Sequence, residues 1–592
     1  MCGIIAYAGH RPAVPLLVEG LKRLEYRGYD SWGIASILKE KPQLEILKKV
    51  GKISDFKGKK FENSHIAIGH SRWATHGGVT QANAHPHTSE KEGIAVVHNG
   101  IIENYQELRE ELAQEGHKFK SETDTEVIPH LIERYIEFGF EKAFQKALAR
   151  LKGRFAIVVV GEKQETIMAA RRGSPMIVGK GKDEYFVASD IPAFLPYTRN
   201  VMYIDDNEML IIRKKGKKSD IKFYDLHDNS EVEKRIIEID WDYADAEKGD
   251  FDHFMLKEIM DQKDTISRAI NQDTDAIMQV AEKINNAYGT FLVGCGTAGK
   301  VCLAGDYFLS KIAKKHVNFV VASEFSAYHH FLTDKTLMVV VSQSGETADV
   351  LEAMEVAKEK GVQILSLVNV EGSSIQRQSD YSFLINAGPE KAVASTKAAT
   401  SQLSLLLLNA YAVAGKLEEG RKILIETASK INDMLNPRYL TYIKAVAEQI
   451  YKQENMYIIG KGENYPMALE SAIKIQEVSY IHAEGFAAGE LKHGPIALIE
   501  GGVPCLVLLS KDENYQDVIN NAVELKSRGG YIIGISPENN EVFDQWIKVP
   551  DVNSASPIVN IIPVQILAYY LAVLRGKNPD MPRNLAKSVT VK

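Results

Sequence analysis

Cysteine is scarce in this chain: only Cys2, Cys295, Cys302 and Cys505 occur among 592 residues. No two of them have the Cys-x-x-Cys spacing, so neither a disulfide framework nor a thiolate zinc site is predicted. The start, Met1-Cys2-Gly3-Ile4-Ile5, has no basic segment and no long apolar run follows it. A signal peptide and a membrane span are therefore not predicted. We expect a cytoplasmic protein.

Basic residues are fewer than acidic ones: the chain has 71 Lys and Arg and 78 Asp and Glu, which gives a formal net charge of −7. Phosphate-driven binding of nucleic acid needs a clustered positive surface, so a nucleic-acid partner is not expected. The 43 Gly and 19 Pro are no more than average, which excludes a collagen-like or low-complexity chain. The length predicts three or four domains.

The first part of the chain, 1–240, has short alternating runs typical of strands at 2–8, 66–69, 93–97 and 155–160. Helical periodicity occupies 104–114 and 127–151. This mixture predicts an α/β domain. An acidic stretch without periodicity follows, and we place a linker at 241–250.

Beyond the linker, apolar strands alternate with turns and long helices, which is typical of βαβ units around a parallel sheet. The segments 291–296 and 457–462 resemble each other, and further matches recur at nearly the same offset. We therefore expect two similar, doubly wound subdomains at 251–435 and 436–592.

The two copies differ in the loop that follows the apolar run 337–341 in copy one. Copy one continues Ser342-Gln343-Ser344-Gly345-Glu346-Thr347 into a helix, which gathers hydroxyls and free N–H groups at a helix N-terminus and predicts a phosphate site. Copy two has Asp512 and Glu513 at this place, which would repel a phosphate. Only copy one is expected to bind phosphate, although a plain serine-rich turn is the alternative.

A glycine motif gives a competing prediction. The run 294–299, Gly-Cys-Gly-Thr-Ala-Gly, satisfies the dinucleotide fingerprint, and Glu324 ends the next apolar run. A nicotinamide-dependent oxidoreductase is therefore one alternative. The motif is short and occurs often by chance, and the hydroxyl-rich loop at 342–347 suits a sugar phosphate better.

Cys2 would become the first residue if Met1 were removed. The freed α-amine, with a pKa of about 8, could then act as general base for the thiol. The alternative is a buried terminal cysteine with Met1 retained. Polar clusters at 27–31, 69–77, 98–102 and 121–126 favour the nucleophile, because they hold the groups that grip an amino-acid amide and stabilise an oxyanion.

These segments resemble the glutaminase domain of amidotransferases with an N-terminal cysteine nucleophile, a domain with αββα layers. The resemblance implies that Cys2 attacks the glutamine amide and that Asn99 and Gly100 stabilise the oxyanion. It further implies roles for the glutamine-binding residues Arg72, Thr75, His76 and Asp124 and for a channel gate, Trp73. A metal cluster of His85, His87, His70, His76 and His98 is a disfavoured alternative, because no acidic or thiolate partner recurs at ligand spacing. No metal is expected.

In copy two, three charged residues interrupt an apolar helix. Glu470, Lys474 and Glu477 follow at steps of four and three and so share one stripe. The alternative is a solvated helix face with ordinary ion pairs. The loop-prone run 483–495 would bring His493 near the stripe. The last segment, 580–592, would by itself be a frayed tail.

Both copies with this tail resemble the sugar isomerase (SIS) domain of the glutamine:fructose-6-phosphate aminotransferase family. The resemblance implies conversion of fructose 6-phosphate and glutamine to glucosamine 6-phosphate and glutamate, the first step toward UDP-GlcNAc, with no cofactor. It implies a Schiff base on Lys587, proton transfer by Glu477, ring opening by His493 and charge stabilisation by Lys474. The residues implied for the sugar phosphate are Thr297, Ser342, Gln343, Ser344, Thr347, Val393, Ala394 and Ser395.

The same resemblance implies an internal ammonia channel and a homodimer. The family usually has Ser-Tyr where this chain has Ala298-Gly299, so one phosphate contact is missing and weaker sugar binding is expected. A non-catalytic sugar-phosphate sensor is a third alternative, but it has no need of Glu477, His493 and Lys587 together.

Overall fold

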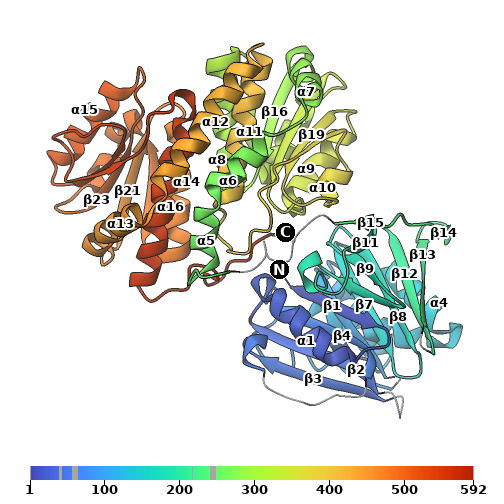
Figure 1. The fold of residues 1–592 in the computed structure, drawn as a ribbon. Coiled ribbons are helices and arrows are strands. Elements are labelled where there is room, and N and C mark those ends of the chain that lie inside the picture. The colour runs from blue at the N-terminus through green and yellow to red at the C-terminus, as the bar shows by residue number, and fades with distance from the viewer. Residues whose placement is uncertain are drawn as a thin grey trace. The chain divides into compact units, whose positions relative to one another are not determined.

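The computed structural model describes residues 2–38, 43–56, 64–91, 93–216, 218–239 and 248–590. The chain forms two compact units, Met1–Asp245 with Ala586–Lys592, and Ala246–Leu585 (Figure 1). Most of the expected linker, 241–247, lies outside the described residues.

The first unit contains two mainly antiparallel sheets. One has the strand order β15-β11-β9-β10-β1-β4-β2-β3 and the other β14-β13-β12-β8-β7-β6-β5. The strands of the first sheet are β1 (Gly3–Ala8), β2 (Ser31–Leu38), β3 (Leu44–Val50), β4 (Ser64–Arg72), β9 (Ile177–Gly181), β10 (Glu184–Ala188), β11 (Asn200–Tyr203) and β15 (Ile237–Glu238). The strands of the second sheet are β5 (His87–Thr88), β6 (Ile94–Gly100), β7 (Phe155–Gly161), β8 (Thr166–Arg172), β12 (Glu208–Lys215), β13 (Lys218–Asp225) and β14 (Glu231–Val232).

Successive side chains of each strand point to opposite faces of its sheet, and both faces are covered, which produces four layers. Ile4 and Ala6 of β1 share a core with Val97 of β6 and Val158 of β7, so the two sheets pack face to face. The outward residues Ile5 and Tyr7 pack under α1 (Ala13–Arg23). The outer face of the second sheet is covered by α2 (Tyr105–Gln114), α3 (Val127–Arg134) and α4 (Phe140–Arg150). The expected αββα order is confirmed.

The single helix expected over 127–151 is wrong. The chain leaves α3 at Tyr135, makes a short 3₁₀ turn at Ile136–Phe138, and starts α4 after Gly139. Gly139 has φ +89°, in a region that side chains other than glycine avoid, so the helix cannot continue through it.

The second unit contains two parallel five-stranded sheets of the same topology, β17-β16-β18-β19-β20 and β22-β21-β23-β24-β25. The strands of copy one are β16 (Gly289–Gly294), β17 (Asn318–Val321), β18 (Thr336–Ser342), β19 (Gln363–Val368) and β20 (Tyr381–Leu384). Those of copy two are β21 (Asn455–Gly460), β22 (His482–Ala487), β23 (Pro504–Leu508), β24 (Tyr531–Ser536) and β25 (Gln545–Lys548). The expected pair of doubly wound subdomains is confirmed, and β22 occupies the start of the run that was expected to be loop.

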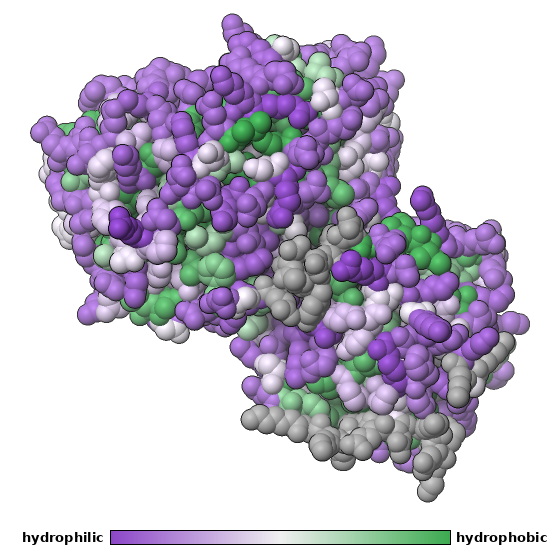
Figure 2. All heavy atoms as spheres, in the orientation of Figure 1, coloured by the Kyte–Doolittle hydropathy of each residue, from purple (hydrophilic) through white to green (hydrophobic). Residues whose placement is uncertain are grey.

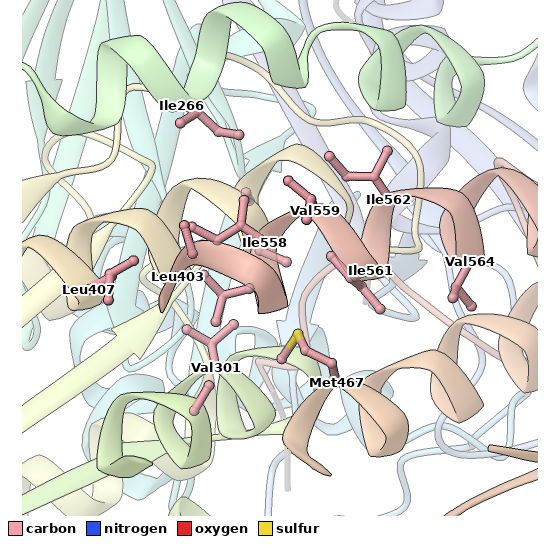
Figure 3. Close-up of a cluster of buried hydrophobic side chains, with 14 of the residues drawn as sticks. Ile266, Val301, Leu403, Leu407, Met467, Ile558, Val559, Ile561, Ile562 and Val564 are labelled. Atoms are coloured by element: carbon pink, nitrogen blue, oxygen red, sulfur yellow. The ribbon is translucent and has the colours of Figure 1, made fainter. Parts of the chain in front are cut away.

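The two copies share one core, in which α8 (Gly296–Phe308), α11 (Lys397–Val413), α14 (Asn464–Ser479) and α16 (Ser556–Leu574) supply many of the side chains. Figure 3 shows Val301 of copy one and Met467 of copy two facing the same group of residues from α16. The segment Asn553–Leu574 is long and apolar enough to cross a membrane, but 83% of its apolar window is buried inside the protein. Hydrophilic residues cover most of the face seen in Figure 2.

Candidate active site

The thiol of Cys2 lies at the junction of two strands. Cys2 directly precedes β1, and β1 pairs with β4 so that Gly3 is opposite Ser71. This register brings Trp73 to the thiol: its N–H donates to Sγ at 3.3 Å, and its carbonyl oxygen lies 3.5 Å from Sγ. Burial raises the pKa of Cys2, whereas the Trp73 backbone bond and the charge of Arg72 lower it.

Asn99 and Gly100 end β6 beside this cysteine. The Asn99 Nδ2 donates to the carbonyl oxygen of Cys2 at 3.0 Å, and its Oδ1 lies 3.1 Å from His70 Nε2. Gly100 has φ +120°, and a Cβ there would lie 2.0 Å from the carbonyl oxygen of Arg154. The side-chain amide of Asn99 is thus held in place, and only glycine fits after it.

The residues expected to bind glutamine surround the same strand ends. The buried Arg72 donates to the carbonyl oxygens of Gly78 at 3.0 Å and Gly77 at 3.1 Å, and also to that of His76. Arg72 therefore holds the loop after β4, in addition to any contact with a ligand. Asp124 is buried and accepts from the N–H of Ile102 at 2.8 Å.

Thr75 is exposed, whereas Trp73 and His76 are half-buried. His76 and Thr75 contact each other, with Nδ1 and Oγ1 3.4 Å apart. The loop that carries these three residues is therefore open to solvent on the side of Thr75.

The first-unit histidines His70, His85, His87 and His98 are buried. His98 Nδ1 and His85 Nε2 lie 2.8 and 2.9 Å from the Thr125 hydroxyl, and His87 Nε2 lies 3.0 Å from that of Thr123. Burial lowers the pKa of His70 to about 3. Burial also lowers the pKa of His85, His87 and His98, so these rings are neutral. The bonds of His87 and His98 connect the segment that holds Asp124 to β5 and β6.

In the second unit Glu470 and Lys474 of the charged stripe on α14 are buried and Glu477 is half-buried, so a solvated face is wrong. Lys474 Nζ lies 3.4 Å from Glu470 Oε1 and also forms an ion pair with Glu477. Lys474 is fully buried and Glu470 is 1% exposed. Burial by itself lowers the pKa of Lys474, but Glu477 and Glu470 raise it beyond its ordinary value. Burial raises the pKa of Glu470 to about 7, although Lys474 opposes this.

Copy one contacts this stripe through Thr297 in the first turn of α8, whose hydroxyl donates to Glu470 Oε1 at 3.0 Å. The loop that connects β18 to α9 (Ala348–Lys358) is folded around Ser342. The Ser342 hydroxyl accepts from the N–H of Gly345 at 3.0 Å and lies 3.0 Å from the Thr347 hydroxyl.

The N-terminus of α9 lacks a side-chain cap. Thr347 occupies the N-cap position but makes no side-chain bond to the helix, so the first N–H groups of α9 have no cap. Gln343 and Ser344 are half-buried in the same loop, where Ser344 Oγ accepts from Glu346 N at 3.2 Å. Gly345 has φ +65°, which turns the loop.

Copy two has a different loop. Lys311 of copy one reaches it, with Nζ 2.9 Å from both Glu463 and Glu513. The Ser510 hydroxyl accepts from Asn464 Nδ2 at 2.6 Å. Glu513 of this loop and Glu463 before α14 thus both pair with Lys311, and the expectation that only copy one binds phosphate stays a prediction.

In the segment before α11, Val393 and Ala394 are buried and Ser395 is half-buried. The Ser395 Oγ donates to Glu390 Oε2 at 3.1 Å. Glu390 also accepts from the N–H groups of Thr396 and Ala398, and its charge acts on Lys474. Sequence reasoning missed Glu390 and gave Glu470 no role. The signal for Glu470 was present, since it lies one turn before Lys474.

Two predicted catalytic residues lie on other segments than α14. His493 is exposed at the end of a 3₁₀ helix, Ala488–His493. Lys587 lies in the closing segment, Ala586–Lys592, which groups with the first unit. Their roles stay predictions.

Comparison with known proteins gives two family matches. A glutamine amidotransferase domain matches 33–224, and a SIS domain matches 283–412 and 449–575. The glutamine–fructose-6-phosphate aminotransferase (isomerizing) of Pyrococcus horikoshii is 45% identical, and that of Clostridium tetani 42%, each over 100% of both chains. The C-terminal domain of glucosamine-fructose-6-phosphate aminotransferase from Francisella tularensis matches 56% of this chain and 99% of its own, with 31% identity and a TM-score of 0.51.

Proposed function

The chain belongs to the glutamine–fructose-6-phosphate aminotransferase (isomerizing) family, and from this premise we propose that it makes glucosamine 6-phosphate and glutamate from fructose 6-phosphate and glutamine. The observation that carries the proposal is the presence, in one chain, of a half-buried Cys2 beside a fixed Asn99 amide and of a buried Glu470–Lys474 pair joined by the half-buried Glu477. The first releases ammonia from an amide, and the second moves protons on a sugar.

In the glutaminase step, the Cys2 thiolate attacks the amide carbon of glutamine. Once Met1 is removed, the α-amine of Cys2 accepts the thiol proton and passes it to the leaving ammonia. The negative oxygen of the tetrahedral intermediate accepts hydrogen bonds from Asn99 Nδ2 and the N–H of Gly100. Water then hydrolyses the thioester to glutamate. We assign Arg72, Thr75, His76 and Asp124 to glutamine binding.

In the isomerase step, His493 opens the sugar ring and Lys587 forms a Schiff base with the open-chain ketose. Ammonia replaces Lys587 at C2, and Glu477 then moves a proton from C1 to C2. Lys474 stabilises negative charge on the sugar oxygen. The uncapped start of α9, with Ser342, Gln343, Ser344 and Thr347, binds the phosphate, while Thr297, Val393, Ala394 and Ser395 line the sugar.

We further propose that ammonia passes through an internal channel gated by Trp73, because free ammonia would be protonated in water. The exposed position of His493 supports a homodimer in which this histidine serves the site of the second copy. The product would supply UDP-GlcNAc synthesis, and the four free cysteines suit a cytoplasmic enzyme.

The test compares the two nitrogen sources. Cys2→Ala should abolish synthesis of amino sugar from glutamine but retain synthesis from ammonium salts, whereas Lys587→Ala should lose both. Cys505→Ala, which removes a buried thiol of the second unit, is the matched control and should retain both activities. Synthesis from glutamine by Cys2→Ala would disprove the nucleophile. Binding of NAD in place of fructose 6-phosphate would instead favour an oxidoreductase.

A further inference from the structure

Three metal-ligating side chains converge in the first unit, away from Cys2 and its partners. The Nδ1 atoms of His117 and His130 lie 3.2 Å apart, and Glu133 Oε2 lies 3.5 Å from the first and 3.9 Å from the second. Within the residues that the structure describes, this is the one group of three or more His, Cys, Asp or Glu side chains with such converging ligand atoms. We propose that His117, His130 and Glu133 bind a divalent transition-metal ion, with zinc as the best fit.

The distances suit this ion. A point equidistant from the three atoms lies about 2.1 Å from each, close to the 2.0–2.2 Å of zinc bonds to nitrogen and oxygen. Two histidines and one glutamate form a known zinc donor set, with a fourth position left for water. If the 3.9 Å distance between His130 Nδ1 and Glu133 Oε2 became slightly shorter, the ion would lie outside the plane of the three ligand atoms. The fourth position would then be open.

The backbone fixes all three ligands. His130 and Glu133 are one turn apart on α3, so both project from the same face. His117 follows the end of α2, where its N–H bonds the carbonyl of Leu112 at 3.0 Å and Gly116 takes φ +96°. This is the Schellman arrangement of a helix end, which sets the direction in which His117 leaves.

The surroundings also favour a cation. Glu133 Oε1 accepts from Lys91 N at 2.6 Å and Oε2 accepts from Glu90 N at 3.3 Å. These bonds orient the carboxylate with Oε2 near the two histidines. The Nε2 atom of His130 is buried without a hydrogen-bond partner and lies 3.9 Å from Glu126 Oε1. If Nδ1 binds the metal, Nε2 carries the proton and faces this carboxylate, the usual outer partner of a metal-bound histidine.

His117 is the ligand nearest to solvent, with 15% of its side chain exposed, so an ion can reach the site. The charges of Glu133, Glu115 and Glu90 all act on His117. The ion would join the end of α2 to α3 and stabilise the helical layer over the second sheet. This role is structural. The presence of the metal site is therefore independent of the proposed function.

The experiment measures metal bound to the full chain. After incubation with Zn²⁺ and removal of the excess, elemental analysis should find one zinc per chain, and Co²⁺ should give the intense visible bands of a tetrahedral site without the charge-transfer band of a thiolate ligand. Zn²⁺ should also raise the unfolding temperature of the first unit, since it binds only the folded state.

His117→Ala and Glu133→Gln should lose the bound zinc, the cobalt bands and the shift in unfolding temperature. His227→Ala, which removes a histidine from a remote turn, is the matched control and should keep all three. His117→Asn guards against misfolding of the alanine variant. Zinc content and cobalt spectra that are the same in the wild type and in His117→Asn would overturn the proposal, as would a wild type that binds no zinc.

Discussion

Replacing Gly100 with alanine tests how closely the end of β6 is constrained. The new Cβ would lie 2.0 Å from the carbonyl oxygen of Arg154, next to the Gly100–Phe155 pair that ends the β6–β7 ladder. Backbone cannot move away as a flexible side chain can, so overpacking costs about 1–3 kcal/mol. A side chain at φ +120° costs about 1–3 kcal/mol more. Together the first unit should lose about 2–6 kcal/mol of unfolding free energy.

Gly116→Ala is the matched control. Gly116 has φ +96° in the same unit, but a Cβ there would meet nothing within 4 Å. It carries the backbone cost without the clash, and we expect a loss of about 1–3 kcal/mol. The difference between the two variants isolates the steric contact at the end of β6.

Hydrogen exchange read by mass spectrometry can measure both variants in the intact chain, because it follows β6 and β7 separately from the second unit. Faster exchange in Gly100→Ala should coincide with loss of glutamine hydrolysis, while synthesis from ammonia persists. Equal exchange in the two variants would refute the steric argument. Normal glutamine hydrolysis by Gly100→Ala would refute the placement of an oxyanion donor there.

Two further predictions concern the second unit. Burial raises the pKa of Glu470 from 4.5 to about 7, so the folded unit holds this proton more tightly than the unfolded chain does. The resulting stabilisation is complete below pH 4.5 and is lost as the pH rises through 7, which amounts to about 3 kcal/mol. Glu470→Gln should remove this pH dependence from the unfolding free energy of the unit, measured between pH 4.5 and 8; an unchanged pH profile would contradict the titration. At the phosphate loop, Ser342→Ala should raise the KM for fructose 6-phosphate roughly 10- to 150-fold, because it removes one hydrogen bond to a charged group. Glutamine hydrolysis should be unchanged. Ser510→Ala, the equivalent change in copy two, should leave this KM as it is, and a similar rise in both variants would mean that Ser342 acts through the fold.

Much of the architecture could be predicted because it depends on local patterns. Apolar strands alternating with helices predicted the two parallel subdomains, and the repeat predicted their common topology. The break between α3 and α4 was missed, because the apolar periodicity of both helices hid the single residue, Gly139, whose positive φ separates them.

Chemical roles were less accessible to the sequence. The steps between Glu470, Lys474 and Glu477 showed that they share a face, but the same pattern fits a solvated helix surface. Burial decided between the two, because α14 packs against α8 and α16, which buries Glu470 and Lys474 and leaves Glu477 half-buried. Glu390 is 80 residues before Glu470 in the sequence, and no periodicity relates it to Lys474.

Hydrophobic period and motif spacing are properties of neighbouring residues, so the sequence by itself predicted a mixed α/β first domain, the doubled parallel sheet and Cys2 as a candidate nucleophile. The αββα layering was implied by the family resemblance. Tertiary structure alone decided which polar groups meet. It raised the pKa of Glu470 by burial, and it brought His117 to His130 and Glu133. These contacts depend on how helices pack, and packing is fixed by the whole core rather than by any local run of residues.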